Sequence, residues 1–112
     1  MVNDILTAAG VPFRRGRFIP PAPATYAVYT DDLTTDGPDR GGLTVPGMPV
    51  IVTHRVDVEL YESRPDDAAE VAIEAAILAA GLQFDKQDRT WLQSEQQYQV
   101  VYTFEYTEKR RI

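Results

Sequence analysis

The sequence predicts an α+β domain: a mostly antiparallel sheet of about 4–5 strands, one main helix packed on it, and a short N-terminal helix. Two observations support this. Runs that alternate apolar and polar residues, which are typical of half-buried strands, flank a single long run with helical spacing. The chain has 112 residues, of which 44% are hydrophobic, and this is enough for one domain with its own core. We therefore treat residues 1–112 as a single domain.

The first part of the chain predicts a helix followed by a strand. Residues 1–9 favour a short helix that ends at Gly10, and it must pack on the rest of the domain because it is too short to be stable alone. The proline-rich stretch "RFIPPAPA" then favours extended backbone. It leads into a strand at about 24–31, "TYAVYTDD", which has apolar residues on both faces.

Residues 32–49 predict a long irregular loop. They contain the turn-forming pairs Asp36-Gly37 and Gly41-Gly42 and three prolines. The loop is longer than most connections in a compact domain, so it is either disordered or a mobile arm that a partner orders. Its aspartates invite comparison with a calcium loop, but the spacing of acidic ligands in an EF-hand is absent.

The second strand, at about 50–62, contains the only histidine. From His54 onward the strand alternates cleanly, which places His54 on one face and Asp57 and Glu59 on the other. These three side chains cannot form one site within the strand. We expect His54 to be a strand residue that is partly buried or lies at an interface.

Residues 63–81 form the clearest helical signal. Ser63 is a candidate N-cap and Gly81 a candidate C-terminal stop. Asp67, Glu70 and Glu74 share one face, which we expect to be solvated because carboxylates there complement the helix dipole. The expected apolar stripe consists of Ala69, Ile73, Ala76, Ile77 and Ala80.

The last part of the chain predicts short strands at 82–86 and 89–93 and a long strand at 97–107. The long strand carries a stripe of aromatic residues, and a tryptophan lies on its neighbour. Two interpretations stay open: an ordinary core, or a surface that faces another subunit, since aromatic residues concentrate in interfaces. The aromatic residues considered for that interface are Trp91, Tyr98 and Tyr102.

Charge and composition exclude several classes of protein. The formal net charge is −6, which is unlike a nucleic-acid-binding domain. Two basic clusters, one of Arg14, Arg15 and Arg17 and one at 109–111, are interpreted as solvated surface or subunit contacts. The chain has no cysteine, no phosphate-binding glycine motif and no apolar run long enough for a bilayer. We expect no enzymatic activity, no cofactor, no metal, no membrane and no sequence-specific nucleic acid.

Four stretches, in this order, resemble a known family: "TAAGVPFRRGRF", "PPAPATYAVYTDD", "HRVDVELYES" before a helix, and "AGLQFDKQDRTWLQSEQQYQVVYTFEY". They are similar to the small tail-terminator and tail-completion proteins of long-tailed bacteriophages and prophages, often described as minor capsid or head–tail joining proteins. The resemblance covers nearly the whole chain outside residues 32–49. The long Pro/Gly-rich loop and the alanine-rich helix depart from the family.

The resemblance implies a non-enzymatic structural protein that caps the tail tube and joins tail to head. It implies a homohexameric ring whose partners are the tail-tube protein and the head-completion protein. Its expected location is the tail–head junction of the virion, and the host bacterial cytoplasm during assembly. The alternatives are another head–tail connector or head-closure protein, or a small ligand-binding domain with a pocket lined by Tyr102 and Tyr106. The candidate subunit interface comprises Arg14, Arg15, Arg17, Glu70, Glu74, Trp91, Tyr98 and Tyr102.

Overall fold

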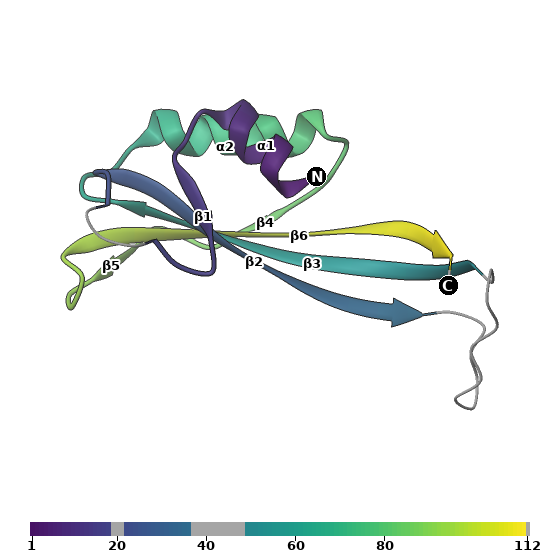
Figure 1. The fold of residues 1–112 in the computed structure, drawn as a ribbon. Helices are drawn as coiled ribbons and strands as arrows, with labels where there is room; N and C mark the ends of the chain where they lie inside the picture. The colour runs from purple at the N-terminus through teal and green to yellow at the C-terminus, as the bar shows by residue number, and fades with distance from the viewer. Residues whose placement is uncertain (19–21, 37–48, 112) are drawn as a thin grey trace.

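The computed structural model describes residues 1–18, 22–36 and 49–111, and over these residues the predicted α+β class is confirmed. Both helices lie on one face of a single sheet (Figure 1). The elements, in chain order, are α1 (Val2–Ala9), β1 (Phe13–Arg15), β2 (Thr25–Asp36), β3 (Pro49–Glu62), α2 (Asp67–Ala79), β4 (Asp85–Lys86), β5 (Thr90–Leu92) and β6 (Gln97–Arg111).

The sheet has six strands in the order β1-β2-β3-β6-β4, and β5 pairs with the same side of β6 as β4 does. All pairs are antiparallel except β1 with β2, which is parallel. The prediction of about 4–5 strands was therefore one too few. It missed β1 because three residues, Phe13–Arg15, are too short to show an alternating pattern.

Three strands are long and give the molecule its shape. β2, β3 and β6 have 12, 14 and 15 residues, and they run on past the two helices (Figure 1). We call this projecting part, residues 31–36, 49–54 and 106–111, the tongue. The prediction of a mobile loop at 32–49 was wrong for residues 32–36, which pair with β3 up to Asp36 opposite Ile51. Polar Thr and Asp residues are compatible with a solvated strand. It was also wrong for Pro49, which begins β3, and residues 37–48 lie outside the described residues.

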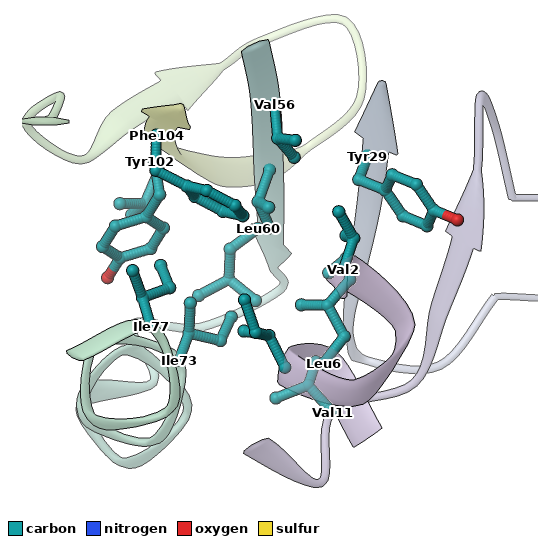
Figure 2. Packing of buried hydrophobic residues seen from close by; sticks show 14 of the residues in the cluster. Val2, Leu6, Val11, Tyr29, Val56, Leu60, Ile73, Ile77, Tyr102 and Phe104 are labelled. Carbon is teal, nitrogen blue, oxygen red and sulfur yellow. The ribbon is translucent and has the colours of Figure 1, made fainter. Parts of the chain in front are cut away.

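The core lies between the helices and the sheet (Figure 2). α1 contributes Leu6, α2 contributes Ile73 and Ile77, and the sheet contributes Leu60 and Tyr102, all with no more than a trace of exposure. Each such aliphatic side chain contributes about 1.5–3 kcal/mol on burial. This packing is what holds the short helix α1 in place.

The ends of α2 are set by two local features. Asp66, rather than the predicted Ser63, caps the start, and its carboxylate accepts a hydrogen bond from the backbone N–H of Ala69 at 3.1 Å. Ser63 still belongs to the sheet, because its N–H donates to the carbonyl of Ala24. Gly81, with φ of 80°, ends the helix as predicted.

Candidate functional site

The predicted basic cluster lies at one lateral side of the sheet. Arg14 and Arg15 are on β1, Arg17 follows the turn at Gly16, and all three are exposed, as expected. Arg14 lies over the ring of Phe18 at 5.0 Å. In the described chain none of the three forms an ion pair with a carboxylate. The three arginines are therefore available to form ion pairs with another molecule.

The acidic residues of α2 do not form the expected solvated face. Glu70 is buried, and its two oxygens contact Arg89 and Lys86. Glu74 is partly buried and accepts hydrogen bonds from Lys86 at 3.0 Å and from the hydroxyl of Tyr102 at 2.9 Å. The expectation that Glu70 is exposed to a neighbouring subunit is therefore wrong, whereas a subunit contact by Glu74, whose side chain is 29% exposed, stays a prediction. The segment from 82 to 90 brings two cations against the helix, and they neutralise these carboxylates internally.

Glu62 is a buried member of the same cluster that sequence reasoning missed. It has no exposed surface, accepts a hydrogen bond from the N–H of Asp66 at 2.8 Å and lies 3.4 Å from Arg89. Burial, together with the neighbouring Glu70, raises the pKa of Glu62 to about 7. A signal was present, because Glu62 lies in phase with buried Leu60 on its strand.

The pKa of Glu70 shifts in the opposite direction. Burial disfavours its charged form, but hydrogen bonds from Arg89 and Lys86 outweigh burial and hold its pKa below the usual range. Asp67, which also contacts Arg89, is 88% exposed. The cluster therefore joins β3, α2 and the β4–β5 connection, and its polar groups are satisfied within the chain, which makes it structural.

Of the aromatic interface candidates, Tyr102 was predicted wrongly. It is fully buried beneath α2 and packs edge-on against Phe84, with ring centroids 5.5 Å apart. Trp91 is 43% exposed and Tyr98 is half-buried, and their rings meet at 4.9 Å across β5 and β6. The core interpretation therefore holds for Tyr102, whereas Trp91 remains accessible to a partner.

His54 lies between two carboxylates from the neighbouring strands. Its Nδ1 is 3.0 Å from Asp31 on β2, its Nε2 is 3.0 Å from Glu108 on β6, and its ring stacks on Tyr106 at 4.3 Å. Burial lowers the pKa of His54, but the two carboxylates outweigh burial and raise it overall. The predicted separation from residues 57 and 59 is confirmed, because those side chains lie on the other face of the sheet.

The tongue has an outer strand on each side, β2 on one and β6 on the other, and we call the outward edge of each strand its border. The N–H of Ala27 donates toward β1 and the carbonyl of Tyr29 accepts from Gly16, so odd-numbered residues of β2 turn their backbone groups outward. By the same alternation the backbone groups of Asp31, Leu33 and Thr35 face outward beyond β1.

The border on β6 follows from one hydrogen bond. The carbonyl of residue 101 accepts from the N–H of Gln87 on the β4 side, so the backbone groups of odd-numbered residues of β6 face outward too. These outward residues on β6 are Glu105, Thr107 and Lys109.

Two large apolar side chains are exposed on the outer side of α2. Val71 and Leu78 are 65% and 58% exposed on the side of the helix that turns away from the sheet.

In the described part of the chain, no group of histidine and carboxylate side chains is arranged to hold a metal ion. No helix there is long and apolar enough to cross a membrane. Comparison with known proteins found no matching family model and no matching curated protein.

Proposed function

We propose that this chain is a non-enzymatic assembly subunit of a long-tailed phage or prophage, a tail terminator that closes into a homohexameric ring, caps the tail tube and joins it to the head. The sequence resemblance suggests this role. The structural observation that supports it is the tongue, a three-stranded ribbon that projects past the helices and has no strand neighbour at either border within the described residues. Such borders are a liability in a monomer and a means of association in an assembly.

The two borders suit each other. β2 and β6 both run antiparallel to β3, so they run parallel to one another toward the same tip of the tongue. In a ring whose axis runs along the tongue, rotation keeps strand direction and brings the β6 border of one copy beside the β2 border of the next as a parallel pair. Ring closure would pair both borders.

The surface chemistry agrees with an assembly role. The buried ionisable groups, Glu62, Glu70 and His54, are each held by partners within the chain. Exposed apolar side chains at Leu33, Ile51 and Val71 leave area for protein contacts. In this proposal the partners are the tail-tube protein and the head-completion protein, and the ring sits at the tail–head junction of a virion assembled in the bacterial cytoplasm.

Tube capping tests the role directly. Tail-tube protein of the same phage is polymerised with and without the purified chain, and the tubes are examined by electron microscopy. We expect a ring of density on tube ends and arrested growth. Binding to head particles with no effect on tubes would instead identify a head-closure connector, which is the alternative within the same apparatus.

A further inference from the structure

The basic cluster lies on the β2 side of the sheet, and its charges are not used within the described chain. β1 pairs with Ala27 to Tyr29 of β2 and forms the end of the sheet on that side. Arg14, Arg15 and Arg17 are exposed there. These three cations form a local patch of positive charge on an acidic protein, and such a patch can steer association with a negative surface.

The opposite lateral side carries unused negative charge. β4 lies at the far end of the strand order, outside β6; it carries Asp85, and the connection from β4 to β5 carries Asp88. Both are exposed, and neither forms an ion pair among the described residues. The cations beside them, Lys86 on β4 and Arg89 in the connection, already pair with the carboxylates of α2 and β3. Within β4 and this connection, the charge that remains for a partner is therefore negative.

A surface depression lies at the same place. It has a volume of about 420 Å³ beside β4, and its lining includes the carboxylates of Asp85 and Glu105, together with Phe84 and Arg55. Arginine side chains suit such a site, because the guanidinium group binds carboxylates in a bidentate manner and stacks on aromatic rings.

We infer that Arg14, Arg15 and Arg17 of one copy dock against Asp85 and Asp88 of the next copy, beside the seam formed by the tongues. The inference rests on the proposed ring. In that ring the β2 side of each copy meets the β6 side of its neighbour, and the strand order places β1 and β4 at these same two sides. This contact replaces the expected one with Glu70 and Glu74, whose charges are neutralised internally. It sets the register of the seam.

Two charge-reversed variants test the contact, with assembly measured at low salt by mass photometry. One carries R14E, R15E and R17E, and the other carries D85K and D88K. We expect each variant alone to fold and to lose at least tenfold in ring yield, since exposed charges contribute little to the stability of a monomer. General repulsion cannot explain both losses, because the lysine variant brings the net charge of −6 closer to zero.

Mixing the two variants is the decisive step. In a head-to-tail ring an equimolar mixture can alternate, so that the new glutamates meet the new lysines at one seam and the native arginines meet the native aspartates at the next. Alternation closes only rings with an even number of subunits. We expect the mixture to restore rings. As a control, a labelled arginine-to-glutamate variant is mixed with a T7K/A8K variant, which carries its added positive charge on exposed positions of α1. T7K/A8K keeps both sides of the contact and should form rings by itself, but it should not rescue the labelled variant by taking it into these rings.

The outcomes separate this contact from the ring itself. Wild-type assembly with full assembly of both reversed variants would overturn the inference and leave the ring standing. Rescue by T7K/A8K as effective as rescue by D85K/D88K would overturn it as well, because nonspecific attraction would then explain both. A wild-type chain that forms no ring at all would refute the proposed function.

Discussion

The Nδ1 atom of His54 lies 3.0 Å from the carboxylate of Asp31, and on the other side of the ring Nε2 lies 3.0 Å from Glu108. One imidazole thus links the three long strands near the base of the tongue. Asp31 and Glu108 are the charged groups that face it, and Tyr106 stacks on its ring. Protonated histidine can donate to both carboxylates at once, whereas the neutral ring can donate to only one.

Stability should therefore depend on the charge of His54. Its pKa is raised in the folded state, so its contribution is fully present below the ordinary value of 6.5 and is lost as pH rises through the folded pKa. We expect H54Q to cost roughly 2 kcal/mol at low pH and progressively less above pH 6.5, on the scale of charged hydrogen bonds. Urea unfolding of both proteins across this range measures the difference. A cost that does not change with pH would show that His54 stays neutral.

Glu62 gives a second pH effect in a lower window. Its folded pKa of about 7 lies above the ordinary value of 4.5, so the folded state holds a proton that the unfolded state releases. Stability should fall as pH rises from 4.5 toward 7. The E62Q variant imitates the protonated form and should flatten this slope, so that it matches or exceeds wild type at pH 8. Equal losses at pH 5 and pH 8 would mean that Arg89 requires a charged Glu62.

Arg89 should be important for the stability of the fold, although one of its three carboxylate partners, Asp67, is exposed. R89M would leave buried Glu62 without its cation and buried Glu70 with Lys86 alone, and we expect a clear loss in the free energy of unfolding. The matched control is D67N, which removes the third partner of the same arginine. Asp67 is 88% exposed, so its loss should cost less than about 1 kcal/mol. Denaturant titration measures the free energy of unfolding of both variants. Equally small losses in R89M and D67N would show that the contacts of Arg89 with Glu62 and Glu70 do not stabilise the fold.

Tyr102 and Trp91 should respond in opposite ways. Y102A removes a fully buried ring and should cost about 3–5 kcal/mol of stability. Y102F removes only the hydroxyl bond to Glu74 and should cost about 1 kcal/mol. W91A should leave most of the stability in place, because Trp91 is 43% exposed. Thermal unfolding compares the three, and a Y102A protein as stable as W91A would contradict the core position of Tyr102.

Leu33 allows the border of β2 to be tested without disturbing the ladder to β3. Its backbone N–H faces outward and its side chain is 52% exposed, so L33P should remove one donor at the border and keep the fold. L33A removes the side chain and keeps the donor. We expect L33P to lose ring assembly and L33A to retain it, as measured by solution mass. Loss in L33A alone would assign the contact to the side chain instead of the backbone.

Much of the fold follows from local patterns. The alternation along β3 separates His54 from Asp57, because side chains on one strand change face at every residue. The spacing of Ile73 and Ile77 identifies the buried face of α2, and Gly81 marks its end. Each of these inferences needs only neighbouring residues, so a single sequence is sufficient.

The contacts between distant segments could not be predicted in the same way. Asp31 and Glu108 meet His54 only because of the register of three strands, and no pattern within one strand specifies that register. Glu70 has the spacing of a solvated residue and becomes buried because the chain after α2 returns with Lys86 and Arg89. Glu62 follows buried Leu60 by two residues on the same strand, so the alternation of side chains predicts that it points to the same buried face.

The central claim, that these chains join through the borders of their tongues, is tested most directly by the solution mass of the wild-type chain as its concentration is raised, with electron microscopy of the same samples. The claim predicts a transition from the 12.5 kDa monomer to a single closed species of six copies with a central opening, and no such species for L33P. A wild-type chain that remains at the monomer mass throughout, or an L33P variant that forms the same rings, would contradict it.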